Sequence, residues 1–365
     1  MMIKGQLRTP PATATAKVLA GLFTATLVLP GCGGSSSNGG ETENGGGDAP
    51  EVAAAADIYE GDYNGPTELI PLDDVDDGAA AMDLTYLAGR AHTVLNSLEE
   101  RVAQSLDDEQ PDGTVTVAGD CPQGVEDDSN DGSVNFREVL DPQTPPNNGT
   151  LIITSTYDAF DDYCIEKFDT GGTLPGGQLV IRASSEPYIV KETVTFVDGE
   201  AEKVEIEAIT DNLIFDMRGS QFEMSGKELL VVENNQNAGA LAFDLSFEGD
   251  SAEQDTVLRF LADIENDLTQ EGNIREIEIA SALLGGSVQT RQQDTSNFFD
   301  NFSSCKDGLS HPIYTEAQQG KVTLTGANEK ELIADLSANS NCEKFVLSGG
   351  PEGTFTLLNT LFKGP

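Results

Sequence analysis

Apolar and polar residues alternate one by one through much of the chain that follows residue 112. Leu241, Phe243 and Leu245, for example, are separated by Ala242 and Asp244. A period of two places successive side chains on opposite faces of a strand, so it predicts a sheet with one buried and one solvated face. The same alternation recurs over Thr114–Val117, Leu151–Tyr157, Leu179–Ile181, Val204–Ile206, Ile274–Ile279, Val322–Leu324, Leu332–Leu336 and Phe355–Leu357.

The connections between these segments indicate how the strands pair. Asp198-Gly199 separates two alternating runs, and this dipeptide is a preferred two-residue hairpin turn. Strands joined by short turns run antiparallel, and few helical patterns intervene that could form parallel crossovers. We therefore expect a mainly β fold: a large antiparallel sheet over residues 107–365, curved or folded as a sandwich, preceded by one amphipathic helix.

That helix is predicted over residues 78–106, with Asp77 as its N-cap. Its apolar residues recur at three- and four-residue steps, which makes one apolar face. They are Leu84, Leu87, Ala91, Leu95, Leu98 and Val102. The chain has only two histidines, His92 in this helix and His311 before a proline, and we expect structural roles for both.

The N-terminus combines a basic segment with an apolar one. Lys4, Arg8 and Lys17 accompany an apolar run at residues 18–29, and Cys32 follows directly after Leu29-Pro30-Gly31. A membrane-spanning helix needs about 20 apolar residues, so this run is too short to be one. The segment is instead typical of an export signal that is removed by cleavage.

This arrangement resembles the lipobox of bacterial lipoproteins. The resemblance implies that signal peptidase II removes residues 1–31 and that Cys32 carries a diacylglycerol and an N-linked acyl chain such as palmitate. Two or three acyl chains hold a protein on a membrane where one chain does not. Gly33, where an Asp would favour the inner membrane, implies the outer membrane, on its periplasmic face or at the cell surface. The remainder is similar to uncharacterised Gly- and acid-rich lipoproteins, a similarity that implies no site residues.

The start of the mature chain and the overall charge limit the partners. Residues 32–77 begin with a Gly/Ser-rich stretch and contain no Lys or Arg, which predicts a flexible acidic tether. The full chain has 20 Lys and Arg against 63 Asp and Glu, a formal net charge of −43. Such a surface repels nucleic acid. The expected partners are therefore the membrane, through the lipid anchor, and an envelope protein or glycan.

Four further cysteines, Cys121, Cys164, Cys305 and Cys342, form an even set in an exported domain. Such a set predicts two structural disulfides, and three pairings exist. Pairing Cys121 with Cys164 and Cys305 with Cys342 closes two loops of about 40 residues each, which the chain-entropy treatment values at about 4 kcal/mol per loop. We favour this pairing.

Residues 127–138 carry the motif with the most specific chemistry, a match to the calcium-binding loop of an EF-hand. Oxygen ligands at this spacing suit the six to eight coordination of Ca²⁺. The ligands would be Asp127, Ser129, Asp131, Ser133, Asn135 and Glu138. Prolines shortly before and after the loop interrupt the two helices that an EF-hand needs. Two interpretations stay open, a calcium site between strands and an ordinary solvated turn, and no other cofactor is expected.

The sequence contains no GxSxG, HExxH or P-loop motif, and we expect no enzymatic activity. The first hypothesis is a noncatalytic binding or structural module of the cell envelope. The second is a carrier of an apolar ligand or lipid in a concave sheet around the helix, similar in outline to periplasmic lipoprotein carriers. The third is a polysaccharide hydrolase with paired carboxylates. A large apolar concavity would favour the carrier, and a polar cleft with two close carboxylates would favour the hydrolase.

Overall fold

The computed structural model describes residues 50–106, 113–119, 132–165, 179–183, 186–217, 220–234, 236–247, 256–267, 273–292, 304–306, 312–314, 321–335, 344–350 and 352–356. Most of these residues lie in strands, which confirms the mainly β fold predicted from the alternating pattern.

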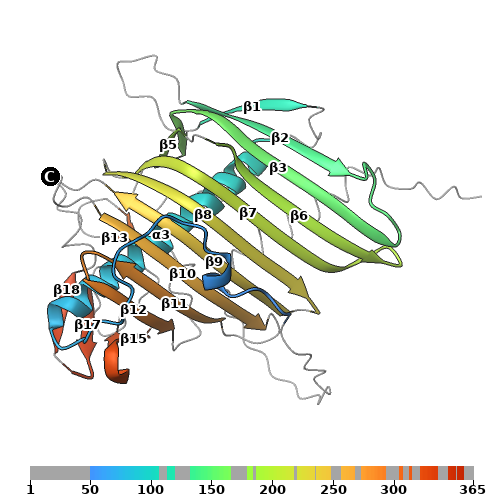
Figure 1. Ribbon diagram of the computed structural model, residues 1–365. Coiled ribbons are helices and arrows are strands. Elements are labelled where there is room, and N and C mark those ends of the chain that lie inside the picture. Colours follow the sequence, from blue (N-terminus) through green and yellow to red (C-terminus); the bar gives the residue numbers. More distant parts are fainter. Residues whose placement is uncertain are drawn as a thin grey trace, which may run out of the picture.

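Sixteen strands form one large antiparallel sheet (Figure 1). Its main path runs in the order β1 (Thr114–Ala118), β2 (Ser133–Asp141), β3 (Gly149–Asp161), β6 (Tyr188–Val197), β7 (Glu200–Met217), β8 (Ser220–Glu233), β9 (Gln236–Phe247), β10 (Thr256–Asp267), β11 (Asn273–Ser281), β12 (Gly286–Gln292), β15 (Lys321–Thr325), β16 (Glu331–Asp335), β17 (Lys344–Ser348) and β18 (Gly353–Thr356). Beside this path, β4 (Tyr163–Ile165) pairs with β5 (Leu179–Ala183), and β5 pairs with β7. β13 (Ser304–Lys306) and β14 (Pro312–Tyr314) form a separate pair.

The predicted turn and strands occur where the sequence placed them. Asp198 and Gly199 join β6 to β7 with φ angles of 52° and 85°. Two positive φ values are what a tight hairpin turn needs to match the twist of its strands, and glycine adopts such a value without strain. Each alternating segment named above falls within, or largely overlaps, a strand of the sheet.

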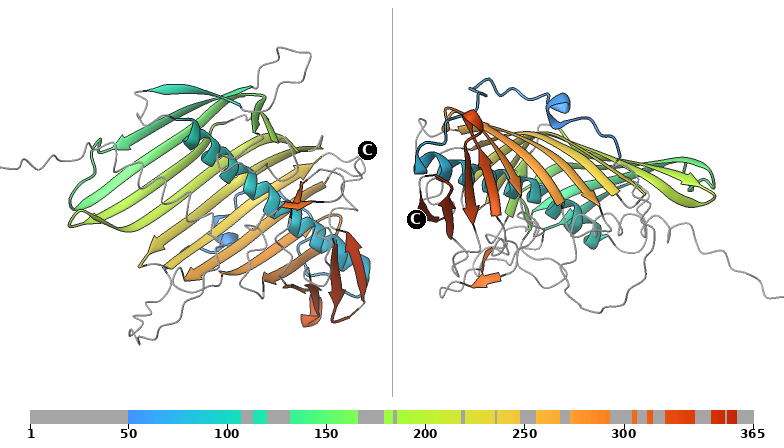
Figure 2. Two further views of the ribbon diagram at one scale, coloured as in Figure 1. Left: turned by 180° about the vertical axis from the view of Figure 1, so that it is seen from behind. Right: turned by 90° about the horizontal axis from the view of Figure 1, so that it is seen from below.

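One long helix, α3 (Val75–Ser105), crosses one face of this sheet diagonally (Figure 2). We call that face the helix face. Leu84, Leu95, Leu98 and Val102 are buried and belong to one continuous core with the apolar residues of the strands. The predicted apolar stripe is therefore confirmed at the positions whose side chains the structure describes.

The start of α3 corrects the prediction by three residues. The N-cap is Asp74, not Asp77, because the Asp74 side chain accepts a hydrogen bond from the backbone N–H of Asp76 at 3.0 Å. Asp77 lies inside the first turn. Several aspartates precede the apolar stripe, so the sequence alone does not identify the N-cap. Leu72, two residues before Asp74, is buried in the core and fixes the position of the chain where the helix begins.

Residues 50–72, which we call the strap, begin on the opposite face of the sheet, the strap face (Figure 2), and end in the core of the helix face. The tether predicted over residues 32–77 was therefore too long, since residues 50–77, more than half of it, comprise the strap and the start of α3. The short helix α2 (Ala55–Ile58) buries Ala55 and Ile58 against the sheet. The sheet residues that receive them are Ala240, Ala242 and Leu261. Two alanines in β9 leave room for this close approach.

The strap reaches the helix face beside one end of β12. Ile70 N donates to Ser287 O at 3.0 Å, and Ser287 N donates to Glu68 O at 2.8 Å. Ala327 N, in the 3-10 turn η2 (Ala327–Glu329), donates to Ile70 O at 2.7 Å. At Gly286 a Cβ atom would clash with the backbone oxygen of Glu68, so only glycine allows this crossing.

Candidate functional site

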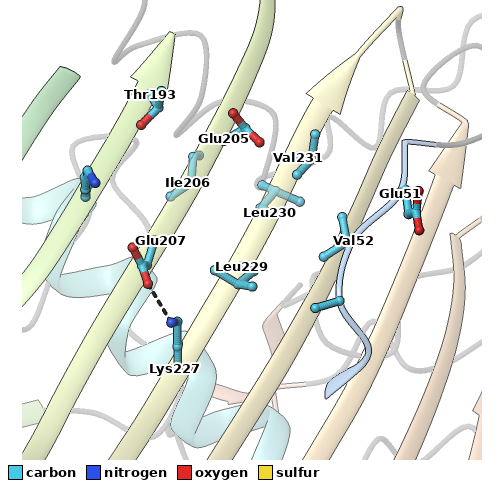
Figure 3. Close-up of a pocket in the computed structure, with 12 residues that line it drawn as sticks. Glu51, Val52, Thr193, Glu205, Ile206, Glu207, Lys227, Leu229, Leu230 and Val231 are labelled. Carbon is cyan, nitrogen blue, oxygen red and sulfur yellow. Dashed lines mark ion pairs between the residues drawn. The ribbon is translucent and has the colours of Figure 1, made fainter. Parts of the chain in front are cut away.

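A groove of about 350 Å³ opens on the strap face between the strap and strands β6, β7 and β8 (Figure 3). Val52 forms part of its wall on the strap side, and Leu229 and Val231 of β8 contribute apolar side chains to its floor. The opposite wall is charged. Its charged residues come from neighbouring strands, and their side chains lie together because cross-strand partners point to the same side of a sheet.

Lysine and glutamate side chains form this charged wall. Lys227 Nζ pairs with Glu207 Oε1 at 2.6 Å, and Lys191 is the cross-strand neighbour of Glu207. Glu205 and Glu51 complete the set of charged residues that line the groove. None of the residues that line it in the described part of the chain is aromatic. The groove therefore offers an aliphatic floor and charges of both signs.

Asp244 of β9 fastens the strap beside this groove. Its carboxylate accepts hydrogen bonds from Tyr59 Oη at 2.7 Å, from Asp62 N at 2.7 Å and from Tyr63 N at 3.2 Å. The guanidinium of Arg259 lies 5.6 Å from the centroid of the Tyr59 ring, a cation-π distance. Burial and the bond to Asp244 raise the pKa of Tyr59 well above its usual value, so its hydroxyl stays a donor.

A second cluster of polar groups lies on the helix face, where the C-terminal part of α3 meets β6. Tyr188 Oη donates a hydrogen bond to Glu99 Oε1. Burial raises the pKa of Glu99 to about 8; the hydrogen bond from Tyr188 lowers it, and the charges of Glu228 and Glu192 raise it. At neutral pH the Glu99 carboxyl is therefore largely protonated.

Glu192 lies on the same face of β6 as Tyr188. Burial and the neighbouring charge of Glu138 raise its pKa to about 7. Glu228 of β8 is only 7% exposed. Four carboxyl groups, from α3, β2, β6 and β8, thus influence one another at the interface between helix and sheet.

Sequence reasoning missed this cluster, although a signal for part of it was present. Glu192 follows Val190 and precedes Val194 in the apolar phase of its strand, and Glu138 occupies the same phase between Phe136 and Leu140. A carboxylate in the buried phase of an alternating strand predicts an ionisable group on the core side. That Glu99 joins them depends on the placement of α3, which no local pattern predicts.

The structure describes half of the candidate calcium loop. Asp127, Ser129 and Asp131 lie outside the described residues, whereas Ser133, Asn135 and Glu138 lie in β2. Asn135 Oδ1 accepts a hydrogen bond from Thr116 Oγ1 at 2.8 Å. Glu138 is three residues further along the strand and so points to the other face, where it influences Glu192. The described half of the motif therefore does not converge on one point.

Of the predicted disulfide cysteines, Cys164 in β4 is disulfide-bonded. Cys121 and Cys342 lie outside the described residues, and Cys305 lies in β13, so the pairing stays a prediction. Cys32 and His311 are also outside the described residues, and His92 lies within α3.

No helix in the described ranges is long and apolar enough to cross a membrane. Within those ranges, no group of three or more His, Cys, Asp or Glu side chains is arranged to hold a metal ion. Comparison with protein-family models, with curated proteins and with solved structures found no match for this chain.

Proposed function

We propose that this protein is a noncatalytic binding module of the cell envelope, anchored in the outer membrane by lipid at Cys32, and that it binds an extended segment of a partner protein. The observation that carries this proposal is the groove on the strap face. Its volume of about 350 Å³ lies at the lower end of the range of about 300–1,000 Å³ that is usual for ligand sites.

The lining of the groove favours a polypeptide over a glycan. Sugar rings bind by stacking on aromatic side chains, and no described residue that lines this groove is aromatic. An extended peptide instead places alternate side chains toward a surface, so aliphatic residues could rest on Leu229 and Val231 while charged ones pair with Lys191 or Glu205. The fixed strap makes one wall of the groove before any partner arrives.

The two other hypotheses find less support. α3 packs into one core with the helix face, and the groove that the structure describes is on the other side of the sheet. This arrangement favours a binding module over a carrier with a concave apolar site. The carboxyl groups with raised pKa lie where α3 meets the sheet, away from the groove, which favours a noncatalytic role over hydrolysis.

The anchor is compatible with this use of the strap face. Seventeen residues lie between Cys32 and Pro50, the first described residue. A fully extended chain of that length spans at most roughly 60 Å. The strap face would therefore stay within reach of other proteins in the same membrane.

Site-specific photocrosslinking in a Gram-negative host tests the proposal. We expect p-benzoylphenylalanine at Thr193, which lines the groove, to form a discrete adduct with an envelope protein. The same crosslinker at the exposed Gln289 of β12 should not form it. Leu229→Asp, which places a charge on the floor, should abolish the adduct. Equal crosslinking from both positions, an adduct that survives Leu229→Asp, or no adduct at Thr193 would contradict a peptide-binding groove.

A further inference from the structure

The contact between Glu99 and Tyr188 joins two separate layers of the molecule. Glu99 lies two turns before the end of α3, and Tyr188 is fully buried at the start of β6. The hydrogen bond between their side chains is thus a direct polar link between the C-terminal part of the helix and the sheet. Hydrogen bonds at a buried interface are sensitive to charge because little water screens them.

Further titratable groups face this link from the adjoining strands. Glu138, Ser155, Val190, Ala208 and Glu228 are successive cross-strand partners and form one row across β2, β3, β6, β7 and β8. Glu192 lies one row away on β6. Among the described residues, Tyr157, which pairs with Tyr188, and Tyr163 of β4 are further titratable groups in this region. Arg101 is two residues beyond Glu99, about 200° around the helix axis.

Two buried polar atoms in this region have no hydrogen-bond partner among the described residues. One is Glu192 Oε2, and the other is Oγ1 of Thr210, a residue that is 2% exposed and continues the inward-facing series of β7 after Ala208. Buried polar atoms almost always have a partner, and ordered water commonly supplies it. Burying a carboxylate oxygen without a partner costs free energy, above all when the carboxyl group is charged.

We propose that Glu99 and Glu192 form a proton-controlled latch that holds the C-terminal part of α3 against β6 and releases it when the two carboxyl groups lose their protons. A protonated Glu99 shares a neutral hydrogen bond with Tyr188. An ionised pair, by contrast, places two negative charges beside Glu228 and Glu138 at a poorly solvated interface. Like charges in such a place repel strongly, and both lose hydration.

The direction of the pH dependence follows from the folded-state pKa values. These are about 8 for Glu99 and about 7 for Glu192, and both are raised from an ordinary value of 4.5. A group whose pKa is raised by folding stabilises the folded form fully below the unfolded pKa, and this contribution is lost as pH rises through the folded pKa. The latch is therefore most stable below about pH 4.5, and its stability falls progressively as pH rises to about 7 for Glu192 and about 8 for Glu99.

Amide hydrogen exchange on the full chain tests the latch. After correction for intrinsic exchange rates, we expect protection of residues 98–105 to fall at least about tenfold between pH 6 and pH 9, whereas protection of β9 and β10 stays constant. Glu99→Gln keeps the size and hydrogen-bonding capacity of the side chain but cannot ionise, so it should flatten this dependence. Glu200→Gln, at the exposed start of β7 beside the hairpin turn, makes the same change in net charge and should behave like the wild type.

A second variant keeps the test decisive should Glu99→Gln fold poorly. Tyr188→Phe removes the direct link, so protection of residues 98–105 should be lower than in the wild type already at pH 6. It also removes the bond that lowers the pKa of Glu99, so the remaining loss of protection should extend to higher pH. A wild-type protein whose helix protection does not change with pH would overturn the proposal. So would a Tyr188→Phe transition at unchanged or lower pH, or a Glu99→Gln protein with the wild-type dependence.

Discussion

Asp244 shows how one side chain can organise a segment with little sequence signal of its own. The strap holds few large apolar residues, yet three of its donors converge on the Asp244 carboxylate from residues more than 180 positions away in the sequence. Hydrogen bonds to a charged acceptor contribute more than neutral ones, about 1.5–3 kcal/mol each when buried. Partial exposure of this carboxylate reduces that contribution.

We therefore predict that Asp244→Ala lowers the free energy of unfolding by about 1–3 kcal/mol and increases protease cleavage within the strap. Asp263→Ala serves as the graded control, because Asp263 accepts a single strap hydrogen bond, from Ala55 N at 2.8 Å. Denaturant unfolding and limited proteolysis measure the two effects. A strap that is equally sensitive in both variants would show that Asp244 is not its main attachment.

Glu138 gives a second test at the scale of a residue. Because Asn135 and Glu138 lie on opposite faces of β2, we predict that Glu138→Gln leaves calcium affinity unchanged in titration calorimetry. The same titration on Asp131→Asn tests the part of the loop that lies outside the described residues. Loss of calcium binding on Glu138→Gln would mean that the strand rearranges to let both side chains coordinate one ion.

At the scale of elements, two aspartates near the N-terminus of α3 are candidates for its N-cap. Asp74 caps the helix, whereas Asp77 lies in the first turn, where burial and the charges of Asp74, Asp76 and Asp73 raise its pKa. Loss of an N-cap side chain typically costs about 1 kcal/mol.

Asp74→Ala should therefore lower the free energy of unfolding by about 1 kcal/mol. Asp77→Ala, which removes a carboxylate from a repelling set, should leave it unchanged or raise it slightly. Thermal or urea unfolding of the two variants side by side distinguishes them. The reverse order would restore Asp77 as the cap that the sequence pattern favoured.

Strands and strap differ in how far the sequence could predict them. Each strand has its own alternation, and Asp198-Gly199 specifies a hairpin within four residues, so local patterns predicted the sheet. The position of the strap depends instead on contacts with Ala240, Ala242 and Asp244 of β9. Its own composition is that of a flexible chain, so the sequence predicted a tether there. Likewise, Glu99 meets Tyr188 only because a 31-residue helix crosses the sheet at one particular angle. Contacts between distant segments are not visible in local patterns.

For the molecule as a whole, the sheet separates two different environments. The helix face holds the main core and the proton-sensitive carboxyl groups, and the strap face holds the groove. The strap joins them, since it lines the groove at Val52 and reaches the core at Leu72. Partner binding and helix release are therefore predicted on opposite faces of one sheet.

We propose that this sheet is displayed at the outer membrane on a lipid at Cys32, and a comparison of the wild type with Cys32→Ala distinguishes an anchored from a soluble protein. The wild type and Cys32→Ala are expressed in a Gram-negative host, the membranes are fractionated, and the intact mass of each product is determined. We predict that the wild type lacks residues 1–31, carries a mass excess that matches acylation, and alone partitions with the outer membrane. An unacylated, soluble wild-type product would contradict the anchor, and with it the proposed place of the protein in the envelope.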